Sequence, residues 1–142
     1  GSGDDTLSGG TQRDTLNGEA GIDSLMGDAG DDLISGGANN DTLEGGLGFD
    51  TLSGGTGNDV LIGGGQRDTF VFASGDDNDT ITDFQNNVDR LDLSDFGFGS
   101  VGAALAAATE SNGDVVFDFG GGDRLVVENL TEVQLSNDLI LM

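Results

Sequence analysis

The chain has 142 residues and carries 27 acidic side chains against 4 basic ones, a formal net charge of −23. Four arginines without any lysine cannot neutralise a phosphate backbone, so the composition excludes nucleic-acid binding. The absence of cysteine and histidine removes the usual residues of zinc, iron–sulfur and haem sites and of Cys–His or Ser–His catalysis. No apolar stretch approaches the roughly 18 residues of a membrane span, and no cationic leader precedes one. An acidic, glycine-rich chain of this kind is expected either to be disordered or to bind cations.

Residues 1–71 consist of a nine-residue repeat. From Gly9 onward the chain reads GGTQRDTLN, GEAGIDSLM, GDAGDDLIS, GGANNDTLE, GGLGFDTLS, GGTGNDVLI and GGGQRDTFV, and GSGDDTLS before Gly9 is the same unit without its first residue. Position 6 is aspartate in all eight units: Asp5, Asp14, Asp23, Asp32, Asp41, Asp50, Asp59 and Asp68. Position 8 is always large and apolar: Leu7, Leu16, Leu25, Ile34, Leu43, Leu52, Leu61 and Phe70. This regularity indicates a repeat architecture.

Each unit is predicted to be half turn and half strand. Its glycine-rich first half suits positive φ angles, which glycine adopts cheaply. Positions 7 to 9 form a short strand with position 8 inside. Two units then make one coil of about 18 residues, and alternate turns stack on opposite edges of a parallel β-solenoid. We call these the odd edge, with Asp5, Asp23, Asp41 and Asp59, and the even edge, with Asp14, Asp32, Asp50 and Asp68.

The stacked aspartates require a cation. Neighbouring strands lie about 4.8 Å apart, and two carboxylates at about that distance repel by roughly 3 kcal/mol at an effective dielectric constant near 20. Eight large apolar side chains are too few to offset this repulsion together with the entropy of ordering so many glycines. Calcium accepts six to eight oxygens, including backbone carbonyls, whereas magnesium demands a tighter octahedron. The pattern therefore predicts bound calcium.

The units resemble the G-G-x-G-x-D-x-U-x nonapeptide of calcium-binding RTX (repeats-in-toxin) proteins. The resemblance implies a parallel β-roll with calcium between stacked turns, bound by position-6 aspartates that neighbouring ions share and by carbonyls at positions 2 and 4. Three gaps on each edge imply about six ions, with partial sites at the ends. The implied carbonyl ligands are Gly10, Gly37, Gly46, Gly55 and Gly64 at position 2, and Gly3, Gly21, Gly30, Gly48 and Gly57 at position 4.

Some turns depart from the pattern. The second and eighth units carry Gln12-Arg13 and Gln66-Arg67 at positions 4 and 5, and the fifth carries Asn39 at position 4. One hypothesis is that Arg13 and Arg67 stand where an outermost calcium of the even edge would otherwise lie. The alternative is two solvated arginines on turns. The acidic residues 76–79 present a similar choice between one further calcium site and a solvated loop.

From Phe72 onward the repeat stops, and residues 72–142 are predicted to cap the open end of the solenoid. The pattern predicts a short helix from near Ser100 through Thr109 and a turn at Asn112-Gly113. Phe70, Phe72, Phe84 and Phe96 are expected to pack against the last coil. Strands are predicted near Phe70–Phe72, Thr80–Phe84, Arg90–Leu93, Val115–Phe119 and Leu125–Glu128.

The C-terminal half carries a second resemblance. Residues 79–98, DTITDFQNNVDRLDLSDFGF, resemble the stretch after the repeats in secreted RTX proteins such as serralysin-type proteases and alginate epimerase modules. Residues 114–142, which close on Asp138-Leu139-Ile140-Leu141-Met142, resemble the ends exported by type I secretion. The resemblance implies an extracellular bacterial module that folds on calcium binding and supports type I secretion and the stability of a larger exported protein. It also implies contact between the tail and the secretion machinery.

The sequence therefore predicts an all-β protein: a parallel β-roll over residues 1–71 and a β-rich capping and secretion-signal region over 72–142 with one short helix. A polysaccharide- or surface-binding accessory module is the alternative function, although four scattered arginines offer no basic stripe for an anionic polymer. No nucleophile–base pair or open metal site supports catalysis, so no enzymatic activity is expected. Because Gly1 falls at position 2 of a nonapeptide, we expect a monomeric fragment of a larger chain.

Overall fold

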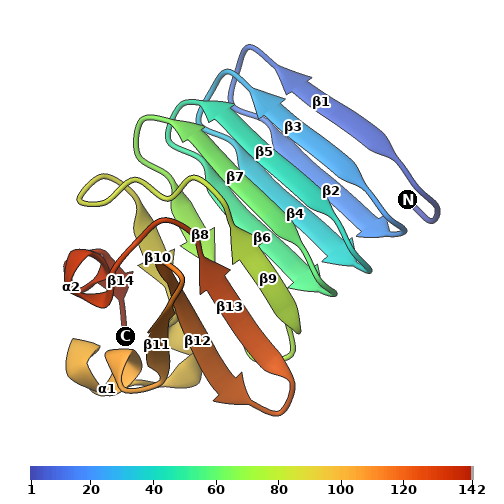
Figure 1. The fold of residues 1–142 in the computed structure, drawn as a ribbon. Helices are drawn as coiled ribbons and strands as arrows, with labels where there is room; N and C mark the ends of the chain where they lie inside the picture. The colour runs from blue at the N-terminus through green and yellow to red at the C-terminus, as the bar shows by residue number, and fades with distance from the viewer. Residues whose placement is uncertain (142) are drawn as a thin grey trace.

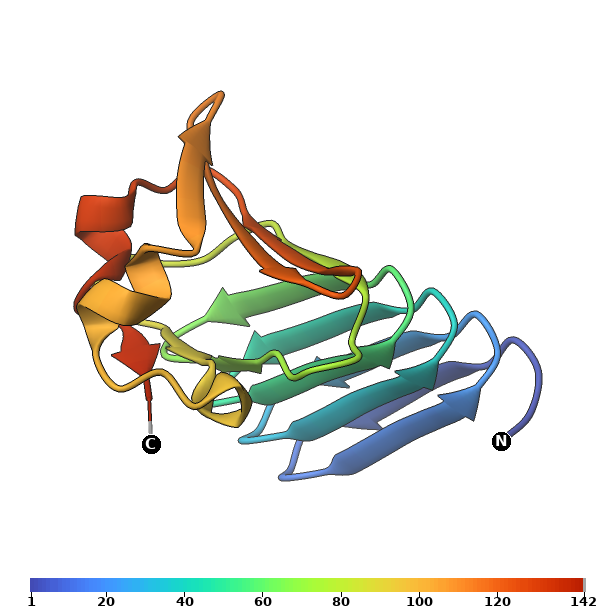
Figure 2. The ribbon, with the colours of Figure 1, turned by 90° about the horizontal axis from the view of Figure 1, so that it is seen from below.

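The computed structural model describes residues 1–141 and consists mainly of two facing parallel sheets wound into a solenoid of about five turns (Figures 1 and 2). One sheet holds the strands of the odd units: β1 (Thr6–Gly10), β3 (Ser24–Asp28), β5 (Thr42–Leu47) and β7 (Val60–Gly65). The other holds those of the even units: β2 (Thr15–Ala20), β4 (Leu33–Ala38), β6 (Thr51–Thr56) and β8 (Thr69–Val71). The predicted fold class and the alternation of units are confirmed.

The nine-residue period sets the strand register. Leu7 pairs with Leu25 and Leu16 with Ile34, so each residue lies beside its equivalent one coil later. The position-8 side chains form a row between the sheets and are buried from Leu16 onward. Leu7, in the first coil, is only partly buried because no earlier coil covers it. The core is therefore a narrow ladder of single apolar residues.

Both sheets continue without interruption past residue 71. β9 (Asn78–Ile81) pairs with β7, and β10 (Arg90–Asp92) pairs with β8. The sequence separation between paired residues is larger here than in the repeats, since Val60 pairs with Thr80 and Thr69 with Arg90. The last parallel strands are β13 (Asp123–Val127) on the odd sheet and β14 (Leu139–Ile140) on the even sheet. The region after the repeats thus continues the solenoid before closing it.

The end of the solenoid is covered by the remaining elements. β11 (Ala108–Ser111) and β12 (Asp114–Gly120) form an antiparallel hairpin that extends the odd sheet beyond β13. The hairpin turns at Asn112-Gly113, as predicted, with φ angles of 58° and 93°. η1 (Ser94–Phe96), α1 (Val101–Leu105) and α2 (Glu132–Leu135) lie at the same end (Figure 1).

The helices differ in detail from the prediction. α1 starts after Ser100 as expected, but it ends at Leu105, and Thr109 already belongs to β11. α2 was not predicted, although Thr131 and Gln134 form a capping box whose Thr-x-x-Gln pattern is visible in the sequence. No helix within residues 1–141 is long and apolar enough to span a membrane.

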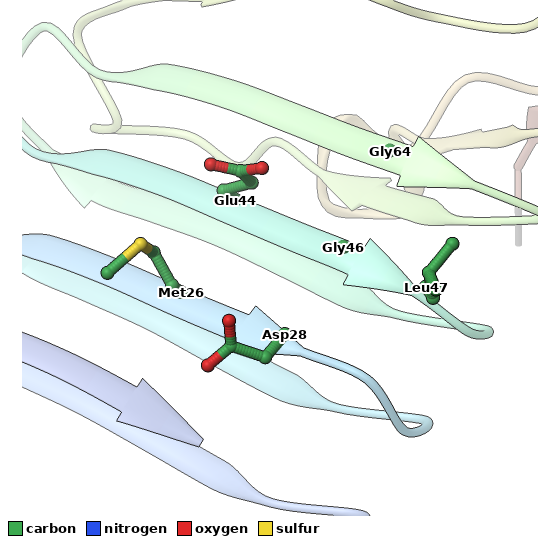
Figure 3. Close-up of a pocket in the computed structure, with 6 residues that line it drawn as sticks. All are labelled: Met26, Asp28, Glu44, Gly46, Leu47 and Gly64. Atoms are coloured by element: carbon green, nitrogen blue, oxygen red, sulfur yellow. The ribbon is translucent and has the colours of Figure 1, made fainter. Parts of the chain in front are cut away.

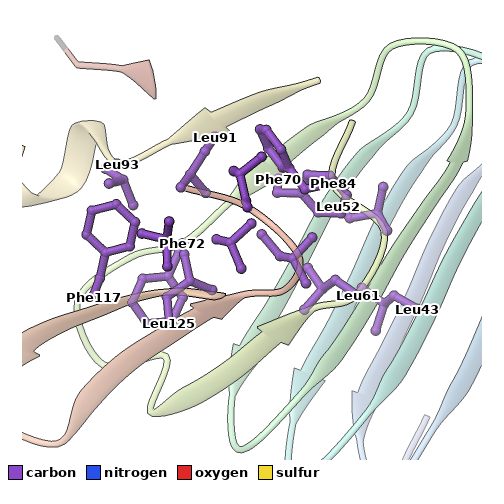
Figure 4. Close-up of a cluster of buried hydrophobic side chains, with 14 of the residues drawn as sticks. Leu43, Leu52, Leu61, Phe70, Phe72, Phe84, Leu91, Leu93, Phe117 and Leu125 are labelled. Atoms are coloured by element: carbon purple, nitrogen blue, oxygen red, sulfur yellow. The ribbon is translucent and has the colours of Figure 1, made fainter. Parts of the chain in front are cut away.

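The phenylalanine prediction is confirmed. The Phe70 and Phe84 rings lie 5.8 Å apart, and the Phe72 and Phe96 rings also lie 5.8 Å apart. Phe117 joins this cluster from β12 (Figure 4). The single-residue core of the repeats widens here into a larger apolar cluster.

Candidate metal sites along the two edges

The position-6 aspartates form a hydrogen-bonded stack on each edge. Within a stack, the Oδ1 atom of each aspartate accepts the backbone N–H of the aspartate one coil earlier. On the odd edge the N···O distances run from Asp5 to Asp23 (2.7 Å), Asp23 to Asp41 (2.8 Å) and Asp41 to Asp59 (2.7 Å). On the even edge they run from Asp14 to Asp32 (2.7 Å), Asp32 to Asp50 (2.8 Å) and Asp50 to Asp68 (3.0 Å). The turns therefore hold every carboxylate after the first coil in one fixed orientation.

The second carboxylate oxygen has no partner. The Oδ2 atoms of seven aspartates are buried without a hydrogen bond: Asp14, Asp23, Asp32, Asp41, Asp50, Asp59 and Asp68. From Asp23 onward these residues are at most 3% exposed. A buried anionic oxygen without a donor is costly unless a cation neutralises it. Asp5, in the first coil, is only half-buried.

Several of the carbonyls predicted as ligands lie in the gaps between coils, whereas those of Gly10 and Gly57 accept the backbone N–H groups of Ala29 (2.9 Å) and Asn78 (3.2 Å). At position 4, a β-carbon on Gly30 would overlap the carbonyl oxygen of Gln12, and one on Gly48 would overlap that of Gly30. At position 2, a β-carbon on Gly55 would overlap the carbonyl oxygen of Gly37. These oxygens therefore point along the solenoid axis toward the next coil. Asn39 takes the place of glycine at position 4 of the fifth unit, and its φ of 82° is also positive, so the turn keeps the same shape.

The position-1 glycines belong to the same oxygen-lined turn, and the sequence analysis missed them. A β-carbon at Gly36 would lie 2.5 Å from Asp41 Oδ2 and 2.6 Å from the carbonyl oxygen of Gly54. Any side chain here would therefore fill the space that faces the unpartnered oxygen. The signal was present in the sequence, because position 1 is glycine in every complete unit: Gly9, Gly18, Gly27, Gly36, Gly45, Gly54 and Gly63.

The electrostatics follow from burial and from the stacking of like charges. Burial raises the pKa of Asp59 to about 6 and that of Asp68 to about 7. Hydrogen bonds from the preceding coil partly offset these rises, whereas Asp41 beside Asp59 and Asp89 beside Asp68 add to them. Burial likewise raises the pKa of Asp41 and Asp50. The edges thus hold carboxylates that are unfavourable as anions without a counter-ion.

Both stacks continue beyond the repeats, which the sequence analysis did not predict. Asp79 Oδ1 accepts the Asp59 N–H at 3.0 Å, and Asp89 Oδ1 accepts the Asp68 N–H at 2.9 Å. Both residues are at most 2% exposed, and burial raises the pKa of Asp79 to about 8. The signal was an aspartate two residues before a buried apolar residue, Ile81 or Leu91.

The loop at residues 76–79 is therefore only in part a solvated loop. Asp79 belongs to the odd stack, and the buried Asp76 accepts the Ala73 N–H at 2.7 Å through Oδ2. Asp77 and Asn78 are exposed. The loop thus forms the next turn of the odd edge.

The two arginines in the irregular turns are exposed. The Arg67 guanidinium lies 5.4 Å from the centre of the Phe49 ring, and within residues 1–141 neither Arg13 nor Arg67 pairs with a carboxylate. The structure agrees with the alternative of solvated arginines on turns, and it does not support the hypothesis that they replace an outermost ion.

The donor set of the edges suits a hard cation. In the described part of the chain, no three acidic side chains come together as an all-carboxylate metal site. Each gap instead offers one unpartnered carboxylate oxygen and several backbone carbonyls. Oxygen-only sites rich in carbonyls fit calcium, whereas soft metals prefer sulfur or imidazole ligands.

A separate hollow lies on the outer face of β3, β5 and β7 (Figure 3). It has a volume of about 320 Å³ and is lined by Met26, Asp28, Glu44, Gly46, Leu47 and Gly64. Its two carboxylates, without a basic residue, are unsuited to an anionic ligand.

A stack of glycine-rich turns with a carboxylate ladder on each edge defines a β-roll of the calcium-binding type. The chain belongs to the family of RTX calcium-binding nonapeptide repeats, whose four-copy family model matches residues 1–34, 17–52 and 44–81. No curated protein matches the chain in sequence.

Three solved structures with the same fold illustrate what the chain resembles. The AlgE6R3 subunit of the Azotobacter vinelandii mannuronan C5-epimerase is 26% identical with a TM-score of 0.57, over 98% of this chain and 78% of that one. The AlgE6R2 subunit is 24% identical with a TM-score of 0.51, over 96% and 91%. The extracellular lipase LipA of Serratia marcescens is 18% identical with a TM-score of 0.54, over 99% of this chain but 38% of the lipase. The last two similarities concern the fold alone.

Proposed function

We propose that this chain is a calcium-folded module that supports the export and stability of a larger extracellular protein. The observation that carries the proposal is the set of buried, unpartnered Oδ2 atoms along both edges. Calcium bound only by the folded chain would neutralise these oxygens, and its binding free energy would then be folding free energy. The chain would stay unfolded where calcium is scarce and fold where it is millimolar.

The proposed ligands are the position-6 aspartates through Oδ2, together with the position-2 and position-4 carbonyls that point into each gap. The carbonyls at position 1, such as that of Gly54, reach the same space. The three gaps between repeats on each edge give about six ions. Oδ1 accepts a backbone N–H through one lone pair, so two ions that shared the aspartate would use Oδ2 and the remaining lone pair of Oδ1.

Residues 1–71 would be the calcium-dependent roll and residues 72–142 its cap and export signal. The proposed signal is folded into the solenoid, since Asp138 is 1% exposed and accepts hydrogen bonds from Arg90 Nη1 (3.0 Å) and the Asn87 N–H (2.9 Å). Its last residue, Met142, lies outside the described residues. A tail buried in this way would be accessible to an export machinery only before folding, which agrees with folding after export.

The first test is far-ultraviolet circular dichroism during a calcium titration of chelator-treated protein, with magnesium as the control. We expect a cooperative change from coil to β-structure between roughly 0.1 and several mM calcium, and none with magnesium. A protein that is fully folded in chelator and unaffected by calcium would refute the proposal. Export is tested separately, by joining the chain to a reporter in a strain with a type I transporter and removing residues 138–142. Unchanged export of the truncated form would refute the role of the tail.

A substrate-binding accessory role is the second candidate, because the epimerase subunit AlgE6R3 matches nearly the whole chain. The outer hollow beside Glu44 is the surface that such a role would use. Its carboxylates favour a neutral or cationic sugar polymer over an anionic one. Affinity electrophoresis in gels containing neutral or uronic-acid polysaccharides tests this role, and equal mobility in all gels would exclude it.

A further inference from the structure

The last gap of the even edge is built differently from the gaps between repeats. It lies between the turn Gly63–Asp68 and the segment 83–89, which carries the next aspartate of the stack. Here the carbonyl oxygen of Gly64, one of the predicted calcium ligands, accepts a hydrogen bond from Gln85 Nε2 at 2.6 Å. The amide group of Gln85 thus occupies the position from which an ion would contact this oxygen.

Asp89, the later aspartate of this gap, has no unpartnered oxygen. Asp89 Oδ1 accepts the Asp68 N–H at 2.9 Å, as in every other gap, but its Oδ2 accepts the Gln85 N–H at 2.7 Å. In the repeats, Asp50 and Asp68 each leave Oδ2 unpartnered, whereas both oxygens of Asp89 have a donor. Gln85 therefore provides donors for both kinds of oxygen, carbonyl and carboxylate, that a calcium ion would contact.

A second carboxylate anchors the segment to the turn. Asp83 accepts the Gly63 N–H through Oδ1 and the Gly64 N–H through Oδ2, each at 2.8 Å. An ion entering the gap would have to displace Gln85 from both of its partners while Asp83 holds the segment in place. The hydrogen bonds of this gap already bridge the two coils and supply donors to oxygens that an ion would otherwise contact, and only Asp68 Oδ2 beside the gap stays unpartnered.

We propose that the chain closes the even-edge row of calcium sites with its own Gln85, whose amide groups take the place of an ion, so that the gap between Asp68 and Asp89 binds no calcium. This inference rests on the proposed function. It assigns to the last coil of the even edge a closure that does not depend on calcium.

The test counts calcium ions on the folded protein by native mass spectrometry at saturating calcium. The matched pair is Asp50→Asn, in a gap between repeats, and Asp89→Asn, in the closed gap, with Asp118→Asn on the surface as the control for lost charge. We expect Asp50→Asn to bind at least one ion fewer, and Asp89→Asn to bind as many as the wild type. A lower count for Asp89→Asn would overturn the inference. Failure of the proposed function would look different, because the wild type itself would then bind no calcium.

A second variant keeps the test decisive if Asp89→Asn does not fold. Gln85→Met retains the length of the side chain but removes its donors. We expect an ion count equal to or above that of the wild type, with a melting temperature in calcium lower by roughly 3 °C for the lost hydrogen bond. A lower ion count would mean that Gln85 helps to hold an ion, and would overturn the inference.

Discussion

Replacing Asp59 with asparagine should have opposite effects on stability with and without calcium. Asp59 is 1% exposed, its Oδ1 atom accepts the Asp41 N–H and its Oδ2 atom has no partner. Asparagine has nearly the same shape and can keep the Oδ1 hydrogen bond. The substitution therefore removes the charge and replaces Oδ2 with an amide group that cannot bind a cation.

The magnitude without calcium follows from the electrostatics of the stack. The pKa of Asp59 is raised to about 6 from an ordinary 3.8, mainly by burial. The folded state thus holds this group as an anion at pH 7 at a cost of about 3 kcal/mol. Repulsion by one neighbouring carboxylate at about 4.8 Å is of the same order, about 3 kcal/mol. In chelator at pH 7, Asp59→Asn should therefore raise the free energy of unfolding by up to about 3 kcal/mol.

In the presence of calcium, Asp59→Asn should instead make the folded state less stable. Loss of a charged ligand oxygen should raise the calcium concentration at the folding midpoint by roughly tenfold or more. In chelator, folding is followed by circular dichroism as trimethylamine oxide is added, since this osmolyte favours the compact state. The variant should fold at a lower osmolyte concentration than the wild type, and require more calcium in the absence of osmolyte.

The exposed Asp118→Asn, which removes the same charge away from both edges, should leave both midpoints nearly unchanged. If Asp59→Asn were less stable than the wild type in chelator as well, the carboxylate would not be a source of repulsion and the argument would fail.

Three further results are expected. Gly36→Ala should destabilise the calcium-bound protein by about 1–3 kcal/mol, because its β-carbon would lie 2.5 Å from Asp41 Oδ2. The control Gly102→Ala, where α1 leaves open space, should be neutral or stabilising by about 0.5–1 kcal/mol. Equal melting temperatures of the two variants in calcium would contradict this. In chelator, the free energy of unfolding should rise as the pH falls from about 8 toward about 4, because the folded chain binds protons at Asp79 and its neighbours that the unfolded chain does not bind. Loss of β-structure over this pH range, measured by circular dichroism, would refute this prediction. Phe117→Ala should lower the free energy of unfolding in calcium by about 3–5 kcal/mol, since the ring is fully buried. An unchanged melting temperature would mean that the cap does not unfold cooperatively with the roll, and would contradict this prediction.

The repeats could be predicted closely because their geometry depends on residue type at fixed positions. Glycine is favoured where a β-carbon would meet a carbonyl of the preceding coil, as at Gly30 and Gly48, so the turns repeat visibly in the sequence. The aspartate ladder and the inward row at position 8 follow from the same period. The roles of Arg13 and Arg67 could not be predicted, because position 5 faces solvent and the contact of Arg67 with the Phe49 ring joins residues 18 apart in the sequence.

The last coil was harder to predict because its turns keep the hydrogen bonds of the aspartate stacks but not the glycines of the repeats. The loops before Asp79 and Asp89 are longer than those of the repeats, so the registers become 20 and 21 residues and the nine-residue count is lost. The closure by Gln85 depends on a side chain that meets a backbone carbonyl 21 residues earlier. No pattern among the residues next to Gln85 in the sequence predicts such a contact.

The two ends of the solenoid differ in what holds them together, and this gives folding a direction. Every gap takes groups from two consecutive coils, so an ion can stabilise a coil only where its neighbour is already formed, and order should spread between neighbours. At the C-terminal end, Phe72, Phe117 and the hydrogen bonds of Gln85 supply order that needs no ion. At the N-terminal end, Leu7 is only partly buried and Asp5 is half exposed. The roll should therefore grow from the cap toward Gly1. At calcium concentrations near the midpoint, hydrogen exchange should protect β7 and β8 before β1 and β2, and protection that began at β1 would reverse the argument.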